Sequence, residues 1–206
     1  ADVALQLTQI FEKELKKEEL DRFFNSVEMP LLPVLLAMEF NGTFVNGKML
    51  ETMSAELGKK IDHLVNDIQN EAGTEFNVNS TQQLASVLFD IKGLPEIKKR
   101  STAENVLHRL KNENLIPGLI LEYRKLNKLK NTYIDALPSL INHETKRIHS
   151  TFSQTITSTG RLSSSNPNFQ NIPIRTEEGR EIRKAFHSEN EDWAIFSADY
   201  SQIELR

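Results

Sequence analysis

The sequence predicts a mainly helical protein with a small β portion, an α+β fold. Two observations support this class. Apolar residues recur at steps of three and four through most of residues 3–135, which is the period of an amphipathic helix. After Pro138 the pattern changes, and residues 148–160 are rich in Thr, Ser and Ile with the alternation typical of strands. We therefore expect β structure mainly in the last third of the chain.

Two helices are predicted at the N-terminus, over residues 3–24 and 28–40, with residues 25–26 as the interruption between them. The second helix is almost wholly apolar, so we expect it to be buried. Its two prolines suit the first turn, where backbone N–H groups have no helical partner. Residues 43–45 are expected to form one short strand.

The clearest amphipathic helix spans residues 48–72, and Gly73 suits its C-terminus. Two capping boxes follow, at Ser80–Gln83 and Ser101–Glu104, and each is expected to open a helix. A further long helix with a basic outward face is predicted over residues 117–135.

The C-terminal segment is expected to contain less helix. Residues 161–176 have no periodic apolar pattern and are predicted to form an ordered loop, followed by a short basic helix over 180–186. Trp193–Ala198 is short, apolar and rich in strand formers, which predicts a buried strand ending at Asp199. The chain stops at Arg206 without a turn or cap, so we interpret it as a piece of a larger protein.

The composition favours a soluble, cytoplasmic protein without a membrane partner. The 206 residues suffice for one large or two small domains, and 38% hydrophobic residues support a packed core. No apolar run approaches the roughly 20 residues of a membrane span, and the first residues lack the layout of a signal peptide. The absence of cysteine excludes disulfides and thiolate metal sites.

Charge is distributed unevenly along the chain. Residues 1–91 carry 7 Lys and Arg against 15 Asp and Glu, whereas residues 92–130 carry 10 against 4. A basic segment in an acidic protein indicates contact with a polyanion. A solvated helical face explains the same pattern equally well.

A candidate phosphate site follows the basic run Lys98–Arg100. Ser101 and Thr102 open the second capping box, and cations beside a capped helix N-terminus suit a phosphate because free backbone N–H groups add to the side-chain charge. The alternative is a capping box that only starts a helix.

The segment Thr159–Pro173 gathers Arg, Asn and Gln side chains with hydroxyls and little apolar content. These side chains hydrogen-bond base edges, including the minor-groove acceptors present on every base pair. The alternative is a polar loop whose Asn and Pro residues form turns. The candidate DNA contacts are Arg161, Asn168, Gln170 and Asn171.

A basic cluster begins at Arg175 and continues with Arg180, Arg183 and Lys184. Arg180 and Arg183 lie one helical turn apart, which suits a phosphate. Pairing with glutamates of the same solvated helix accounts for them as well.

Asp199, at the end of the predicted strand, is a candidate ligand for a hard cation such as Mg²⁺. Glu204 follows five residues later, and this separation does not place both carboxylates on one metal. No nearby His or Asp supplies a second ligand, so the rest of such a site would come from elsewhere.

Several blocks together resemble the family A DNA polymerases, and the resemblance covers essentially the whole chain. Residues 77–84 and 121–133 look like the thumb of that family, Thr159–Ser164 like the palm segment that touches the primer–template, and Asp199–Arg206 like its motif A. The implied fold is a helical thumb followed by the first strands of a truncated polymerase palm.

The resemblance implies three regions. Residues 1–26 would be the C-terminal helix of an exonuclease-like domain, residues 27–142 the thumb region, and residues 143–206 the N-terminal part of the palm, ending at motif A.

The resemblance also implies roles for single residues. Asp199 would be one of two aspartates that bind the two catalytic Mg²⁺ ions, with the Tyr200 backbone carbonyl as a further ligand. Glu204 would be a steric gate that crowds the sugar 2′ position. The residues implied to contact the incoming nucleotide are Ser201, Gln202, Ile203 and Arg175. Those implied to contact the template–primer duplex are Arg161, Asn168, Gln170 and Asn171. Those implied to contact the duplex backbone are Lys130, Asn131 and Thr132.

The implied activity is template-directed addition of dNTPs to a primer 3′-OH in DNA replication and repair. Its partners are primer–template DNA and dNTPs. The fingers helix and the second metal aspartate of the family have no counterpart in this sequence. We therefore expect the chain alone to be a monomer that binds duplex DNA without bound Mg²⁺ and without activity.

Other functions stay open. A non-catalytic DNA-binding module would retain the same surface, and an intact second metal aspartate downstream would argue against it. A single-subunit RNA polymerase relative is disfavoured by Glu204, because a gate that excludes a 2′-OH is wrong for ribonucleotides. A plain helical scaffold leaves the loop from Thr159 to Asn171 unexplained.

Overall fold

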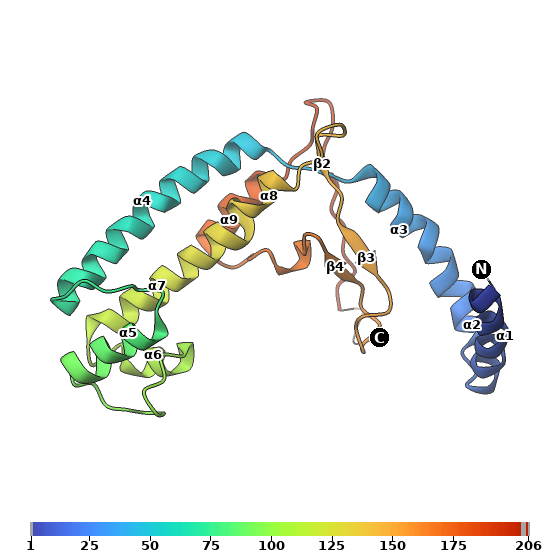
Figure 1. The fold of residues 1–206 in the computed structure, drawn as a ribbon. Helices are drawn as coiled ribbons and strands as arrows, with labels where there is room; N and C mark the ends of the chain where they lie inside the picture. The colour runs from blue at the N-terminus through green and yellow to red at the C-terminus, as the bar shows by residue number, and fades with distance from the viewer. Residues whose placement is uncertain (1, 203–204, 206) are drawn as a thin grey trace. The chain divides into compact units, whose positions relative to one another are not determined.

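The structure is a computed structural model that describes residues 2–202 and 205. The chain divides into two compact units. Unit 1 comprises the described residues of Ala1–Val45, Leu140–Pro173 and His187–Arg206, and unit 2 comprises Asn46–Ser139 and Ile174–Phe186. The predicted mainly helical α+β class is confirmed (Figure 1).

Unit 2 is helical in its described elements. In chain order they are α4 (Gly47–Ala72), α5 (Thr81–Ala85), the π-helical turn η2 (Ser86–Ile91), α6 (Glu104–Leu110), α7 (Leu115–Leu129), the π-helical turn η3 (Lys130–Ile134), α8 (Ala136–Ser139) and α9 (Glu177–Lys184).

The predicted amphipathic helix 48–72 is confirmed as α4. The side chain of Asn46 caps its N-terminus by accepting a hydrogen bond from the Met49 N–H at 3.1 Å. Gly73 ends the helix in the left-handed region at φ 74°, where a residue without Cβ is favoured.

The core of unit 2 is built by α4 and α7, which pack along each other, together with the short helices that follow them (Figure 1). α6 also packs on α7. The apolar stripes predicted from the sequence face this core, because i, i+3, i+4 spacing places them on one side of each helix. Side chains with no exposed surface include Leu50, Ile68, Leu84, Leu88, Leu107, Leu110, Ile116 and Ile120.

The N-terminal helices of unit 1 break at a different place from the prediction. α1 (Asp2–Lys17) ends before Glu19, whose φ of 58° is incompatible with a continuing helix. The chain then stays helical through α2 (Asp21–Phe23), the π-helical turn η1 (Phe24–Glu28) and α3 (Met29–Asn41). The predicted interruption at residues 25–26 is therefore wrong, because η1 carries the helix through it.

The predicted burial of residues 28–40 is also wrong for the described chain. α3 buries only Leu35, whereas Leu36 is 66% and Phe40 is 81% exposed. α3 is apolar on every side, so packing against one hairpin leaves most of its surface uncovered. Two polar contacts hold it there: the Phe152 N–H donates to Glu39 Oε1 at 2.6 Å, and the Gln154 amide donates to Glu28.

One helical stretch of the described chain, Asp21–Asn41, is long and apolar enough to cross a membrane by length and composition. This corrects the expectation that no segment approaches such a span. The core helix of a soluble protein and a signal sequence near the N-terminus meet the same criterion.

The β portion of unit 1 consists of two small antiparallel pairs. β1 (Thr43–Phe44) pairs with β2 (Arg147–Ile148), and β3 (Thr151–Ser153) pairs with β4 (Ser163–Ser165). β4 and the following 3₁₀ turn η4 (Phe169–Asn171) lie inside the segment predicted as loop. The three serines of β4 carry no apolar signal, so only the partner strand reveals it.

The predicted buried strand at Trp193–Ala198 is wrong. The segment has no regular hydrogen-bonded structure, and Phe196 is 90% exposed. A strand needs a neighbouring strand for its N–H and C=O groups, and the described residues supply none here.

Candidate nucleic-acid interface

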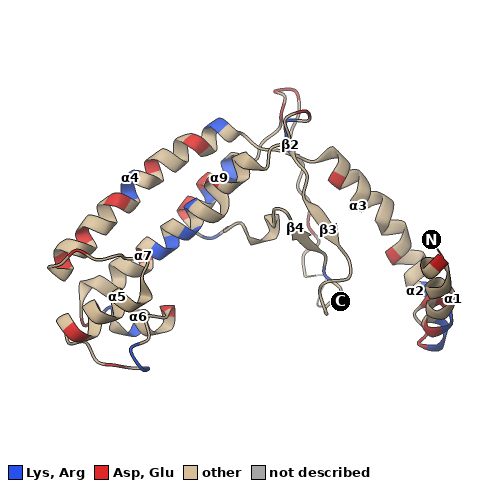
Figure 2. Ribbon diagram, viewed as in Figure 1, with Lys and Arg blue, Asp and Glu red and all other residues tan. Residues whose placement is uncertain are grey.

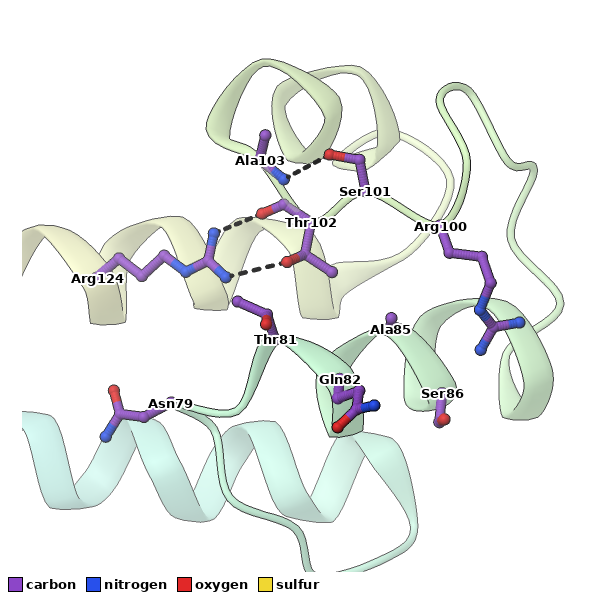
Figure 3. Close-up of a pocket in the computed structure, with 10 residues that line it drawn as sticks. All are labelled: Asn79, Thr81, Gln82, Ala85, Ser86, Arg100, Ser101, Thr102, Ala103 and Arg124. Atoms are coloured by element: carbon purple, nitrogen blue, oxygen red, sulfur yellow. Dashed lines mark hydrogen bonds between the residues drawn. The ribbon is translucent and has the colours of Figure 1, made fainter.

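A pocket of unit 2 has the lining expected for an anion. It is formed by the turn before α5, by α5 and η2, by the loop before α6, and by α7 (Figure 3). The lining carries two arginines, four hydroxyls and two amides but no carboxylate. Hydrogen-bond donors and positive charge without acidic side chains suit phosphate oxygens. The lining residues are Asn79, Thr81, Gln82, Ala85, Ser86, Arg100, Ser101, Thr102, Ala103 and Arg124.

Arg124 of α7 holds the loop that precedes α6. Its guanidinium donates to the Thr102 carbonyl oxygen at 2.5 Å and to Thr102 Oγ1 at 3.4 Å (Figure 3). Burial lowers the pKa of Arg124, opposed by the charge of Glu104. A guanidinium remains protonated at neutral pH, so a positive charge stays at the pocket. Arg124 was not singled out as a site residue from the sequence, although its place on the basic helix was a usable signal.

The predicted capping box at Ser101–Glu104 is wrong. α6 begins after Ala103, which is the N-cap residue and makes no side-chain cap. Ser101 Oγ instead accepts from the Ala103 N–H at 3.3 Å, and the Thr102 hydroxyl faces Arg124. Serine and threonine often bond neighbouring backbone in this way, which competes with capping. Ser101 and Thr102 nevertheless both line the pocket, as a phosphate contact requires.

The turn before α5 supplies the amide side of the pocket. Ser80 caps α5 as predicted, accepting from the Gln83 N–H at 3.3 Å. The second half of the predicted capping box does not form, because the Gln83 side chain accepts from the Asn77 N–H at 2.6 Å and the Ser80 N–H donates to the Asn77 carbonyl at 2.9 Å. The Tyr123 hydroxyl donates to Asn79 Oδ1 at 2.9 Å, which orients that amide at the pocket. Sequence reasoning placed these residues in the thumb without assigning them to the site.

Lys130, predicted to contact the duplex backbone, is engaged within unit 2. Its ammonium lies 2.7 Å from Asp135 Oδ2 and 2.9 Å from Ser54 Oγ, and Ser54 donates to the other Asp135 oxygen at 2.6 Å. Its side chain is 22% exposed. Asn131 donates to Asn127 Oδ1 at 3.2 Å, and Thr132 is exposed.

The lysines of α7 are better exposed than Lys130, which follows that helix in η3. Figure 2 shows basic residues along α7. The sequence of this helix includes Lys125 and Lys128. Lys125 pairs with Glu178 of α9 at 2.9 Å. Lys128 is exposed and has no recorded ion pair among the described residues. Its charge is therefore available to a polyanion.

The polar loop of unit 1 is folded around Gln170. The Gln170 amide donates to the Leu162 carbonyl at 3.0 Å and accepts from the Ser164 N–H at 3.2 Å. Asn168 Oδ1 accepts from the Gln170 N–H at 2.9 Å and so caps η4. These contacts support the interpretation as an ordered loop, and they place Arg161 and Asn171 at its exposed surface.

A buried hydroxyl pair holds the same loop to its hairpin. Ser150 Oγ and Ser164 Oγ lie 2.8 Å apart, so one hydroxyl donates to the other, and both oxygens lie within hydrogen-bond distance of the Pro167 carbonyl oxygen, at 2.7 and 3.1 Å. Both serines are less than 5% exposed. Buried hydroxyls with several partners fix the path of the backbone.

The basic residues around α9 remain open to solvent. Arg175 precedes the helix, and Arg180 and Arg183 lie one turn apart on it, all exposed. Lys184 pairs with Glu181 at 2.6 Å. This pair agrees with the alternative interpretation, in which the basic residues pair with glutamates of the same solvated helix.

The described residues do not by themselves fit a magnesium site. Asp199, Tyr200, Ser201 and Gln202 lie on an exposed segment, and Ile203 and Glu204 lie outside the described residues. In residues 2–202 and 205 no three His, Asp or Glu side chains come together as metal ligands. One exposed carboxylate lacks the several oxygen ligands that Mg²⁺ needs.

The lining of the pocket is of the kind that binds nucleic-acid phosphates. The family model for DNA polymerase family A matches residues 47–206, and the chain belongs to that family. The chain is 49% identical over 197 residues to DNA polymerase I of Geobacillus stearothermophilus, with 94% of this chain and 22% of the relative covered. It is 46% identical over 213 residues to DNA polymerase I of Pseudomonas aeruginosa, with 100% and 23% covered.

A solved structure has the same fold. It is the POL domain of Pol1 from M. smegmatis in complex with DNA primer–template and dNTP, at a TM-score of 0.82 and 36% identity. The comparison covers 89% of this chain and 33% of that one. The chain spans about a quarter of the length of the curated relatives that it matches.

Proposed function

We propose that the chain is part of a DNA-directed DNA polymerase that adds dNTPs to a primer 3′-OH under the direction of a template. The observation that carries the proposal is the shared fold with a polymerase domain whose solved structure holds primer–template and dNTP. In this proposal unit 2 belongs to the thumb, and the polar loop of unit 1 belongs to the palm. The region boundaries at residues 26 and 142 remain part of the proposal.

The chain's own contribution would be a grip on DNA that does not depend on sequence. Phosphates are the same at every step, and minor-groove acceptors are present on every base pair. The pocket around Ser101, Thr102 and Arg124 would meet the phosphates. Arg161 and Asn171 are exposed on a braced loop and would reach the groove, with Asn168 and Gln170 near them.

The nucleotide end of the site would be completed by protein outside this chain. Asp199 and the Tyr200 carbonyl would contribute ligands to a pair of Mg²⁺ ions, which would neutralise charge on the transferred phosphoryl group. Arg175 and the segment Ser201–Ile203 would contact the nucleotide, and Glu204 would exclude a 2′-OH. We expect the longer protein to act in the bacterial cytoplasm, in association with the nucleoid.

The test is binding of the purified chain to a fluorescent primer–template duplex over a series of salt concentrations. We expect monomeric, weak binding that falls steeply with salt, because phosphate contacts release counterions. We expect no primer extension by this chain alone. Binding that is absent or independent of salt would contradict the proposed contacts with DNA phosphates. Primer extension by the isolated chain would contradict the proposal that protein outside this chain completes the active site.

A further inference from the structure

Arg100 lines the pocket, yet its charge is already used. Its two terminal nitrogens donate to both oxygens of Asp90 at 2.6 and 2.7 Å, the geometry of a bidentate pair. Glu96 lies 3.8 Å from the same guanidinium. The guanidinium also lies 5.8 Å from the centre of the Phe89 ring, a cation–π distance. A phosphate at Arg100 would have to displace an acid that matches the guanidinium in shape.

The backbone beside Arg100 adopts an unfavourable conformation. Lys99 and Arg100 have φ of 34° and 55°, in the left-handed region that residues with a Cβ rarely adopt. The turn is closed by the Ser101 N–H, which donates to the Lys98 carbonyl at 2.8 Å. Such a conformation persists only where surrounding contacts hold it. The bidentate pair between Arg100 and Asp90 is one such contact.

The loop is thus held at two points. Arg100 binds Asp90, which lies in η2, and Thr102 is bound by Arg124 of α7. Ser101 stands between them and lines the pocket, while Lys98 and Lys99 are exposed. The hydrogen bond from Arg100 lowers the pKa of Asp90.

We propose that Arg100 is a positioning residue of the DNA-binding pocket: paired with Asp90, it holds the loop of residues 98–103 so that Ser101 and the neighbouring lysines face the duplex, and it does not itself bind a phosphate. This inference rests on the proposed function and adds the Asp90–Arg100 pair to it. A phosphate-binding arginine and a positioning arginine give opposite results when Asp90 is removed.

The test measures binding of the same primer–template duplex by the wild-type chain and by Asp90→Ala, Arg100→Ala and the charge swap Asp90→Arg with Arg100→Asp. We expect both single variants to weaken binding by a similar factor, on the order of three- to ten-fold, because the loop must then be ordered on binding. The swap should recover most of the loss. The slope of log K against log salt should change by less than about 0.9, the value for one phosphate contact.

A direct phosphate contact predicts another outcome. Arg100→Ala would then lower the slope by about 0.9, Asp90→Ala would bind as tightly as wild type or more tightly, and the swap would not recover binding. Any of these three results overturns the proposal. Arg109→Ala, at an exposed arginine of α6, is the matched control for loss of a charge and should leave the affinity within about two-fold.

Two further measurements keep the result interpretable. Circular dichroism on each variant shows whether it folds. Arg100→Lys keeps the charge but loses the bidentate geometry, so its affinity for the duplex should lie between those of wild type and Arg100→Ala. Equal binding by Arg100→Lys and wild type would contradict the need for two parallel hydrogen bonds. Absence of binding by the folded wild-type chain would instead refute the proposed function, and this inference with it.

Discussion

The two units handle their apolar residues differently. In unit 2 the inward faces of α4, α6 and α7 are buried, and the exposed large apolar side chains are few, among them Ile91, Leu115 and Ile174. In unit 1 the helices up to Asn41 and the segment after Trp193 expose most of theirs. Burial of apolar surface is the main favourable term in folding. Unit 2 therefore supplies most of its own stability, whereas unit 1 is ordered largely by backbone pairing and polar contacts.

The strongest test of this comparison is a pair of truncations. Leu107→Ala removes a side chain with no exposed surface in unit 2, and we expect a loss of about 3 kcal/mol in the free energy of unfolding. Phe196→Ala, at a 90% exposed side chain of unit 1, should change it by less than about 0.5 kcal/mol. Urea unfolding followed by circular dichroism measures both values. Similar losses for the two variants would show that unit 1 is buried in solution.

A second test concerns the buried hydrogen bonds that hold the polar loop of unit 1. Ser164→Ala removes one hydroxyl of the buried pair and leaves Ser150 and the Phe169 N–H with fewer partners. We expect a local loss of about 1–2 kcal/mol, visible as faster amide exchange in β3 and β4 with little change in unit 2. Ser153→Ala, at a more exposed position of the same hairpin, is the control. Unchanged exchange would mean that strand pairing alone orders the loop.

A third test compares Lys130, which is paired within unit 2, with the exposed Lys128. Lys130→Met should lower the free energy of unfolding by about 1 kcal/mol, because Asp135 and Ser54 lose the lysine as a partner in a partly exposed site. The same variant should barely change the slope of log K for DNA binding against log salt. Lys128→Ala should do the reverse, with unchanged stability and a slope lower by about 0.9. Anisotropy titrations and urea unfolding on the same samples make the comparison. A reduced slope for Lys130→Met would instead support its predicted role as a phosphate contact.

The smallest expected effect is on pH dependence. Burial would raise the pKa of Asp135, but hydrogen bonds from Lys130 and Ser54 outweigh it and leave that pKa lowered. The pKa of Glu178 is likewise lowered, since bonding to Lys125 outweighs burial. A carboxyl group with a lowered pKa stabilises the fold above its unfolded value and loses this contribution as pH falls below about 4. Asp135→Asn and Glu178→Gln should each flatten the acid side of a curve of unfolding free energy against pH, measured by urea unfolding; an unchanged acid side would contradict this contribution.

Patterns of local origin were predicted well. The helix at 48–72, its stop at Gly73 and the cap at Ser80 follow from side-chain spacing and from hydrogen bonds within a few residues. The capping box at Ser101 failed because Ser101 Oγ accepts from the Ala103 N–H, while Arg124 of α7 binds Thr102. The strand β4 was missed because its three serines have no apolar alternation, and only the backbone pairing with Thr151–Ser153 defines it as a strand.

The sequence by itself determined the helical class, the family and the basic and polar segments proposed to contact DNA, because periodicity and motif blocks are local properties of the chain. Only the tertiary structure decided which charges are available. Lys130 and Arg100 carry the same positive charge as Lys128, but the folded chain pairs the first two with Asp135 and Asp90. Such pairing depends on side chains brought together by packing, and no spacing rule predicts it.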